Sequence, residues 1–354
     1  MPSEVAKDSN PQTVAPSRRT VLSGLGVAAA AAAVSRTASA ATADNKAAAP
    51  QSSALWSNEY VAMKGDVKLQ LYRRRAKAPV AGEAPLPVAV LVHGSSISGM
   101  PSWDLNVPGA GEYSVMNVFA RLGYDVWVID FEGYGRSSIT NGNSDIKSGV
   151  ADLEAAAPVI AKETSAQKFH MLGESSGALR VAAFAAAHPE RVDRLVLGAY
   201  TYTGKDSPTL NERAKQVDFY RTHNRRPRPK EMIESIFTRD KPGTSDPRTA
   251  AALVKAEMPH GDSVPTGTYL DMTAKLPIIE AKLVKAPTLL IRGQYDGIAT
   301  EADILDFYSQ LPNPDRQISI LPGLAHSLTL GINRQLYWHA ANAFLSMPKP
   351  QLII

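Results

Sequence analysis

The chain has 354 residues, of which 44% are hydrophobic and 20% charged, so it is long and apolar enough to bury a core. This composition excludes a mainly disordered, collagen-like or multi-span membrane protein, and a formal net charge of +4 is too small to indicate nucleic-acid binding. Cysteine is absent, which excludes disulfides, zinc–thiolate sites, iron–sulfur sites and thiol nucleophiles.

The first 40 residues do not have the pattern of a folded domain. Arg18 and Arg19 precede an apolar run from Val21 to Val34, and the small residues of Ala38 to Ala40 follow. A membrane-spanning helix needs about 20 apolar residues, and this run is shorter and mostly alanine. The arrangement resembles a twin-arginine export signal. We therefore expect the export machinery to recognise residues 1–40, cleavage near Ala40, and a periplasmic or secreted protein with no stable membrane anchor.

After an Ala/Ser/Gln-rich linker over residues 41–56, expected strands and helices alternate. A hairpin is predicted over Glu59–Met63 and Val67–Arg73, because a turn sequence separates two extended runs. The further strands expected are Val88–Val92, Asp125–Ile129, Phe169–Leu172, Arg194–Leu197, Thr288–Ile291 and Ile318–Leu321. The expected helices are Tyr113–Leu122, Lys147–Lys162, Ser176–Ala187, Glu301–Gln310 and Ile332–Leu345. The alternation predicts an α/β domain over residues 57–348 with a parallel sheet and right-handed crossovers.

Residues 201–284 interrupt this alternation. They contain many charges, several helical stretches and no strong strand pattern. The segment begins after one expected strand and ends before the next. We expect a mainly helical cap over the C-terminal edge of the sheet, where ligands bind in open α/β folds. A separate domain with its own role is the alternative.

A candidate nucleophile lies in Gly173-Glu174-Ser175-Ser176-Gly177, between an expected strand and an expected helix. Small residues on both sides allow a sharp turn that exposes the Ser175 hydroxyl. The N-terminus of the following helix supplies N–H groups and a positive dipole for a developing oxyanion.

Serine needs a base, and the chain has seven histidines. His326 is the expected base because it lies in the loop after the last strand. His93 ends a strand, where an imidazole more often stabilises the loop. Asp296, after the strand Thr288–Ile291, is the expected acid that orients the imidazole. Asp130, at the end of another strand, is the rival.

Together, His93-Gly94, the Asp130–Ser137 turn, the Ser175 turn, the Gly293–Asp296 turn and His326 resemble an α/β-hydrolase with a cap domain. The resemblance implies a mostly parallel central sheet with helices on both faces. It also implies that the N–H groups of Ser176 and Ser95 form the oxyanion hole. The loop after Gly94 is long and carries Trp103, which we expect to line or close over the acyl pocket.

The resemblance implies acyl transfer by Ser175, His326 and Asp296, without a cofactor or metal. Haloalkane dehalogenases and epoxide hydrolases of this fold have an aspartate where this chain has Ser175. We therefore expect a serine hydrolase that cleaves small-molecule carboxylic esters or lactones. The alternatives are a C–C bond hydrolase of the same fold and a non-catalytic binding protein that kept the fold.

A run of positive charge extends from Arg221 to Lys230 in the expected cap. Pro227 and Pro229 exclude a regular helix there, so a solvated loop is the plain interpretation. The alternative is that Arg225 and Arg226 face the cleft and attract an anionic substrate.

Overall fold

The computed structural model describes residues 54–351. The expected export signal over residues 1–40, and residues 41–53 of the expected linker, lie outside the described residues. Trp56, which the sequence placed in the linker, is instead the first residue of strand β1 (Trp56–Lys64). Within residues 54–351, no helix has the length and apolar character needed to cross a membrane.

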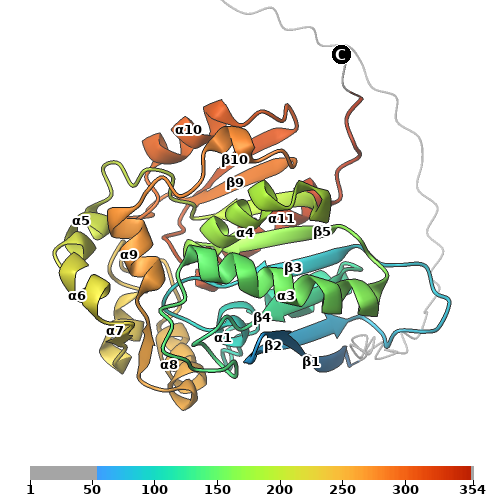
Figure 1. Cartoon of the computed structure of the whole chain (residues 1–354), viewed down its shortest axis with the longest axis horizontal. Helices are drawn as coiled ribbons and strands as arrows, with labels where there is room; N and C mark the ends of the chain where they lie inside the picture. The colour runs from blue at the N-terminus through green and yellow to red at the C-terminus, as the bar shows by residue number, and fades with distance from the viewer. Residues whose placement is uncertain (1–53, 352–354) are drawn as a thin grey trace, which may run out of the picture. The chain divides into compact units, whose positions relative to one another are not determined.

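One mixed sheet forms the centre of the described domain (Figure 1). It contains β1 together with β2 (Val67–Arg75), β3 (Val88–Val92), β4 (Asp125–Ile129), β5 (Phe169–Glu174), β6 (Val192–Gly198), β9 (Thr288–Gly293) and β10 (Arg316–Leu321). The strand order is β1-β2-β4-β3-β5-β6-β9-β10. β2 pairs antiparallel with β1 and with β4, and every pair from β4 to β10 is parallel. The expected mostly parallel sheet is confirmed.

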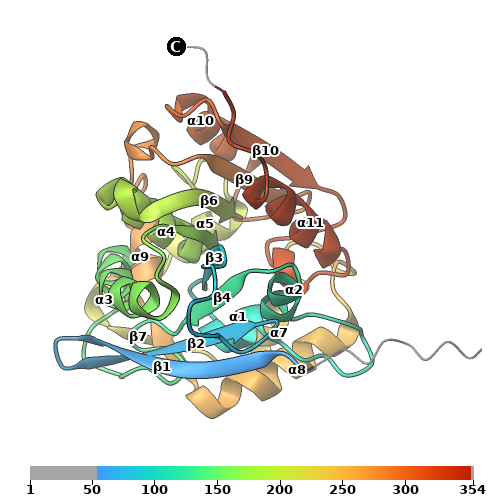
Figure 2. The same ribbon diagram turned by 90° about the vertical axis from the view of Figure 1, so that its right-hand side faces the viewer.

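Helices cover both faces of this sheet (Figure 2). One face carries α3 (Ile146–Thr164), α4 (Ser176–Ala187) and α10 (Glu301–Gln310), whose apolar side chains share one buried cluster. The other face carries α2 (Val115–Arg121) and α11 (Arg334–Leu345). Every residue of β3 and β4 is buried. Burial on both faces explains why β3 and residues 126–129 of β4 are unbroken apolar runs in the sequence.

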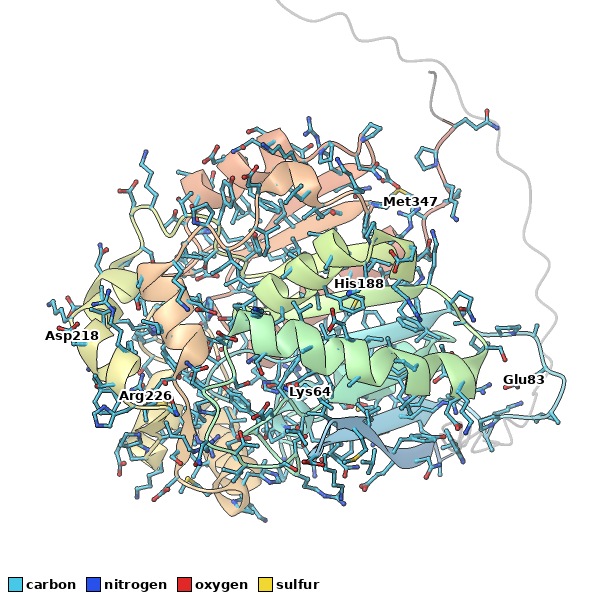
Figure 3. The ribbon with its side chains drawn as sticks, viewed as in Figure 1. Lys64, Glu83, His188, Asp218, Arg226 and Met347 are labelled. Atoms are coloured by element: carbon cyan, nitrogen blue, oxygen red, sulfur yellow. The ribbon has the colours of Figure 1, made fainter. Side chains whose placement is uncertain are left out.

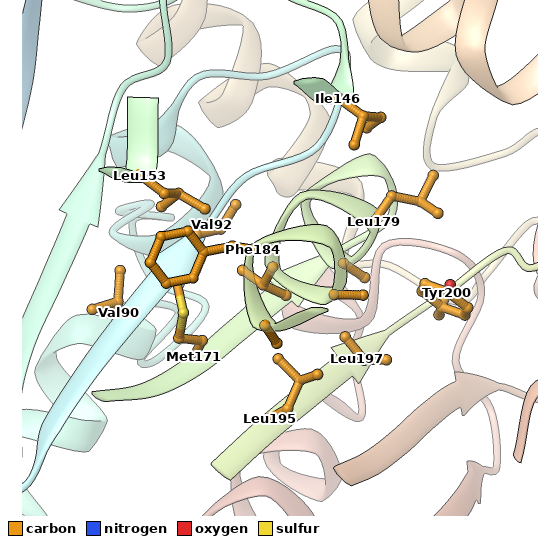
Figure 4. Packing of buried hydrophobic residues seen from close by; sticks show 14 of the residues in the cluster. Val90, Val92, Ile146, Leu153, Met171, Leu179, Phe184, Leu195, Leu197 and Tyr200 are labelled. Atoms are coloured by element: carbon orange, nitrogen blue, oxygen red, sulfur yellow. The ribbon is translucent and has the colours of Figure 1, made fainter. Parts of the chain in front are cut away.

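The packing of α4 against β5 and β6 fixes the position of the turn that carries the candidate nucleophile. Figure 4 shows Leu179 and Phe184 of α4 among Met171, Leu195 and Leu197 of these strands. Burial of one such side chain contributes about 1.5–3 kcal/mol. Several of them together hold the first residue of α4 at the end of β5.

The cap, residues 201–284, lies between β6 and β9 in the chain, and its helices gather at one end of the sheet (Figure 1). They are α5 (Pro208–Ala214), α6 (Val217–Thr222), α7 (Lys230–Ser235), α8 (Pro247–Glu257) and α9 (Gly267–Ala274). The sequence predicted no strand here, but β7 (Arg225–Pro227) and β8 (Ser263–Pro265) form a short antiparallel pair. Three-residue strands are too short to show a period of two, so pattern analysis misses them.

A buried ion pair joins two parts of the cap and fastens them to the loop after β3. Arg228 pairs with Glu257, and both side chains are almost fully buried. Glu257 also accepts hydrogen bonds from the N–H of Ser98 at 3.1 Å and from its hydroxyl at 2.7 Å. The cap therefore restrains the same loop that carries Ser95.

Candidate active site

Ser175 occupies a strained turn between β5 and α4. Its backbone has φ 59° and ψ −126°, a conformation that costs free energy for any residue other than glycine. The flanking glycines make the turn possible. A Cβ on Gly173 would lie 2.4 Å from the Gly177 carbonyl oxygen, and one on Gly177 would lie 2.3 Å from that of Val92. The turn places the Ser175 hydroxyl immediately before the helix, as a nucleophile requires.

His326 and Asp296 lie in the loops after β10 and β9, respectively. His326 Nε2 is 2.9 Å from Ser175 Oγ, and its Nδ1 is 2.8 Å from Asp296 Oδ1. The N–H groups of Ile298 and Ala299 donate to the same carboxylate oxygen and hold it in place. Because β5, β9 and β10 are parallel, their carboxyl ends bring all three side chains to one edge of the sheet.

Asp130, the rival acid, is bound elsewhere. Its carboxylate accepts hydrogen bonds from the N–H groups of Gly99 at 2.8 Å and Arg136 at 2.9 Å. The Tyr72 hydroxyl donates to it at 2.9 Å. Burial raises the pKa of this carboxyl, and the hydrogen bonds oppose that rise. The geometry therefore pairs His326 with Asp296, and Asp130 fastens the turn after β4.

Ser95 and Ser176 meet beside the nucleophile. Ser95 Oγ donates to Ser176 Oγ at 2.8 Å, and Thr268 of α9 donates to Ser95 Oγ at 2.9 Å. Within residues 54–351, neither the Ser95 N–H nor the Ser176 N–H donates a hydrogen bond to the protein. Two N–H groups without acceptors, next to a nucleophile, are suited to stabilise an oxyanion.

His93 is a structural residue. Its Nδ1 lies 2.8 Å from the Gly94 carbonyl oxygen, and the Phe131 N–H donates to its Nε2 at 3.3 Å. Burial lowers the pKa of the imidazole to about 3, so the ring is neutral near pH 7. His93 therefore ties the loop after β3 to the turn after β4, in the stabilising role that its sequence position indicates.

A cleft with a cavity volume of about 60 Å³ opens beside Ser175 and His326. Trp103, at the end of the short helix α1 (Gly99–Trp103), lines this cleft together with Ile236 and Leu330. Its part in acyl binding stays a prediction. Among residues 54–351, no group of three or more His, Asp or Glu side chains is placed to hold a metal ion.

Arg225 and Arg226, which face the cleft in the alternative interpretation of the sequence, lie in different places. Arg225 donates to the Gly133 carbonyl at 3.1 Å and to the Ser263 carbonyl at 2.7 Å, and it lines neither the cleft nor the space beside it. The expectation for Arg225 is corrected: its donors fasten the cap to the turn after β4. Arg226, which Figure 3 shows on the cap, lines a hollow that adjoins the cleft.

Two cations that the sequence did not single out line the cleft beside Ser175. They are Arg213, in the last turn of α5, and Arg239, shortly after α7, and both also line the adjoining hollow. Arg239 pairs with Asp240 at 2.9 Å. No motif marks either arginine in the sequence, because only the path of the cap brings them to the cleft.

Glu174, immediately before the nucleophile, also lines the cleft. Burial raises the pKa of its carboxyl to about 7. Among the described residues, its Oε2 atom has no hydrogen-bond partner. The sequence motif contains Glu174 without indicating a role for it, because local sequence does not reveal how far a carboxyl is removed from water.

Similar proteins were found at the level of family and sequence. The family model described as serine aminopeptidase, S33 (Hydrolase_4) matches residues 109–331. A monoacylglycerol lipase from Mycolicibacterium smegmatis is 25% identical over 252 residues, 69% of this chain and 82% of the lipase. A 2-hydroxy-6-oxononadienedioate/2-hydroxy-6-oxononatrienedioate hydrolase from Paraburkholderia phymatum is 34% identical over 111 residues, 30% of this chain. That match spans only 34% of the relative's length.

Solved structures share the fold. An α/β hydrolase fold protein from Chitinophaga pinensis has a TM-score of 0.58 and 17% identity, covering 82% of this chain and 98% of that one. The carboxylesterase CesB (YbfK) from Bacillus subtilis has a TM-score of 0.57 and 15% identity, covering 82% and 92%. At such low identities the likeness concerns the fold alone. The fold is the α/β-hydrolase fold that the sequence resemblance implied.

Proposed function

The chain belongs to the serine aminopeptidase, S33 family of α/β-hydrolases, and we propose that it is an exported serine hydrolase that cleaves small-molecule carboxylic esters or lactones. The observation that carries this proposal is the position of His326, 2.9 Å from Ser175 Oγ and 2.8 Å from Asp296 Oδ1. A serine hydroxyl is a weak nucleophile until a base takes its proton. The similarity to a monoacylglycerol lipase over 69% of the chain adds support for ester cleavage.

In the proposed reaction, Ser175 Oγ attacks the ester carbonyl carbon while His326 Nε2 takes the hydroxyl proton. Asp296 holds the imidazole in the tautomer whose Nε2 is free to accept, and stabilises the imidazolium that forms. The N–H groups of Ser95 and Ser176 stabilise the tetrahedral oxyanion. His326 then gives the proton to the leaving alcohol. A water molecule, deprotonated by the same imidazole, hydrolyses the acyl-enzyme and releases the acid.

The charges around the cleft favour an ester over a peptide with a free amino terminus. An α-ammonium group needs a carboxylate partner, but Glu212 of the hollow is paired with Lys215 at 2.8 Å. Burial raises the pKa of Glu174 to about 7, which weakens it as a partner for a cation. Arg213 and Arg239 repel an ammonium group. These charges therefore support ester hydrolysis, although the description of the family names an aminopeptidase.

A second candidate is C–C bond hydrolysis by the same three residues. It is favoured by the 34% identity to the 2-hydroxy-6-oxononadienedioate hydrolase, although that match covers only 30% of this chain. The two candidates are separated by activity assays. A panel of p-nitrophenyl esters reports ester cleavage, whereas loss of the absorbance of a 2-hydroxy-6-oxo dienoic acid reports C–C cleavage.

Labelling with a fluorophosphonate probe tests the triad directly. The wild type should be labelled and Ser175→Ala should not, whereas Ser309→Ala, on the exposed face of α10, should be labelled like the wild type. Ser175→Ala and His326→Ala should each abolish turnover of p-nitrophenyl esters. Their double variant should lose little more, because such residues act as a unit. Absence of both labelling and turnover in the wild type would instead indicate a binding protein that kept the fold.

Export is a separate part of the proposal and rests on Arg18, Arg19 and the apolar run after them. Changing both arginines to lysine should leave the precursor in the cytoplasm. The control Arg36→Lys changes a basic residue after the run and should be exported normally. Undiminished export of the double variant, measured by cell fractionation, would contradict the twin-arginine route.

A further inference from the structure

Three cap arginines line the hollow that adjoins the cleft. Arg213 and Arg239 line both the cleft that holds Ser175 and the adjoining hollow, and Arg226 lines the hollow. Burial lowers the pKa of Arg213, and the charges of Arg239 and Arg226 lower it further. Like charges held close together in a partly desolvated place are unfavourable without a partner of opposite sign.

Two of these arginines have no such partner in the protein. Among the described residues, the side chains of Arg213 and Arg226 make neither a hydrogen bond nor an ion pair, whereas the side chain of Arg239 is paired with Asp240. Among the described residues that line the hollow, Glu212 is the one carboxylate, and it accepts two hydrogen bonds of 2.8 Å from Lys215, the residue directly after α5. Each guanidinium group has five N–H donors. The space therefore contains many donors and little negative charge to satisfy them.

Tyr269 of α9 holds both of the unpaired arginines. The guanidinium carbon of Arg213 lies 5.1 Å from the centroid of its ring, and that of Arg226 lies 4.7 Å from it. The ring is fully buried, and its hydroxyl shares a hydrogen bond of 2.7 Å with Ser96 Oγ in the loop after β3. A cation–π contact positions a guanidinium group without using its N–H donors. The donors thus remain available to a ligand.

We propose that Arg213, Arg226 and Arg239 form an anion subsite, and that the preferred substrate is an ester with a free carboxylate at its far end, such as a hemiester of a dicarboxylic acid. This inference rests on the proposed ester hydrolysis and names its substrate class. A carboxylate accepts charge-assisted hydrogen bonds from the guanidinium forks and offsets the repulsion between them. Since Arg213 and Arg239 share the cleft with Ser175, a short acyl chain connects this subsite to the nucleophile.

The test compares two esters that differ only in charge: mono-4-nitrophenyl glutarate and its methyl ester. Arg213→Gln should lower kcat/KM for the acid on the order of 10–100-fold, since charge-assisted hydrogen bonds are lost. It should change kcat/KM for the neutral ester less than about threefold, because that ester makes no ionic contact. Arg226→Gln, which lines only the hollow, should cause a smaller loss on the acid alone.

Arg221→Gln is the matched control. It also removes one positive charge from the cap, but Arg221 is exposed, pairs with Asp218 at 3.0 Å and lines neither space. Its kcat/KM for both esters should match the wild type. If Arg213→Gln and Arg221→Gln lowered kcat/KM for the acidic ester equally, the effect would be one of general charge, and the subsite would be overturned. An equal loss of kcat/KM for both esters in Arg213→Gln would overturn the subsite too.

Binding to an inactive variant separates this inference from the proposed function. Ser175→Ala should bind glutarate in isothermal titration calorimetry, and addition of Arg213→Gln should weaken that binding on the order of 10-fold or more. This result would support the subsite even if the wild type hydrolysed neither ester. Hydrolysis of both esters without preference for the acid, and without glutarate binding, would retain the esterase and overturn the subsite.

Discussion

Two regions of the cleft differ in whether their charged side chains have partners in the protein. We call the loops at the ends of the sheet strands the floor, and the cap, residues 201–284, the roof. On the floor, Asp296 accepts two backbone N–H groups as well as His326, and Arg292 donates to several backbone carbonyls. On the roof, Arg213 and Arg226 rest on one aromatic ring and have no acceptor among residues 54–351. Charges that the protein itself pairs hold geometry, whereas charges without a partner in the protein are those that a ligand meets.

The same contrast holds inside the cap. Arg225 donates to backbone carbonyls, and Arg228 is neutralised by Glu257. The cap therefore provides acceptors for some of its arginines, and the two arginines without an acceptor line the hollow. Elsewhere in the described part of the chain, Arg191 also lacks an acceptor, but it is half-exposed before β6, where water serves its donors. The position of the unpaired arginines, rather than their number, points to a ligand.

The largest expected effect separates the two acids of the floor. Asp296→Asn should lower kcat on the order of 10³–10⁴-fold, because an amide favours the wrong imidazole tautomer. Asp130→Asn should leave kcat within a few-fold of the wild type and instead destabilise the fold by about 1–3 kcal/mol, since it leaves a buried donor facing the Arg136 N–H. Steady-state kinetics on a p-nitrophenyl ester and urea unfolding measure both. A near-normal rate for Asp296→Asn would contradict the pairing with His326.

The floor was largely predictable from the sequence. The bounds of β3, β4 and α4 coincide with the expected ones, because unbroken apolar runs and the Gly-flanked serine turn are local signals. Strands β5, β9 and β10 each extend two residues beyond an expected end, and β6 extends at both ends. The added residues other than Val192 are polar or glycine, which a hydropathy pattern does not assign. Parallel topology then predicts that Ser175, Asp296 and His326 lie at one edge of the sheet.

The roof was not predictable to the same degree. Its elements are short, and their positions depend on tertiary contacts such as the Arg228–Glu257 pair. Charge density pointed to Arg225 and Arg226, yet only Arg226 lines the hollow. Arg213 stands beside Glu212, as on an ordinary solvated helix face, and nothing local distinguishes it. Which arginine faces the cleft is decided by how the cap folds over the sheet.

An intermediate effect is expected at the buried ion pair of the cap. Glu257→Gln leaves the Arg228 cation buried without a countercharge, which should lower the free energy of unfolding by about 3–5 kcal/mol. Urea unfolding at pH 7 measures the loss. Because Glu257 also holds Ser98, esterase activity should fall before global unfolding, as the cap detaches from the loop after β3.

The control for this variant is Glu231→Gln on α7. Glu231 is exposed and its ion pair with Lys230 spans 3.9 Å, so the change should stay within about 0.5 kcal/mol of the wild type. If Glu257→Gln changed the free energy of unfolding as little as Glu231→Gln, the buried pair would not be what fastens the roof. The contrast between paired and unpaired arginines would then have no support from stability.

The smallest effect concerns Glu174, the exception among the charged groups of the floor. Burial raises the pKa of its carboxyl from 4.5 to about 7 in the folded protein. Between these values the unfolded chain has released the proton and the folded protein has kept it. This group therefore makes the folded state progressively less stable as the pH rises from about 4.5 to about 7, and contributes no further change above that.

Glutamine does not titrate, so Glu174→Gln should remove this fall in folding stability between pH 4.5 and pH 7. Its stability relative to the wild type should increase steadily from pH 4.5 to pH 7 and then level off, because only the wild type loses stability over that range. Urea unfolding in half-unit steps from pH 4.5 to pH 8 measures the difference, and the exposed Glu231→Gln should follow the wild-type curve throughout. Parallel curves for Glu174→Gln and the wild type would mean that the carboxyl ionises as freely in the folded protein as in the unfolded chain. Glu174 would then be a charged group of the floor like the others, and its negative charge would face the arginines of the roof across the cleft.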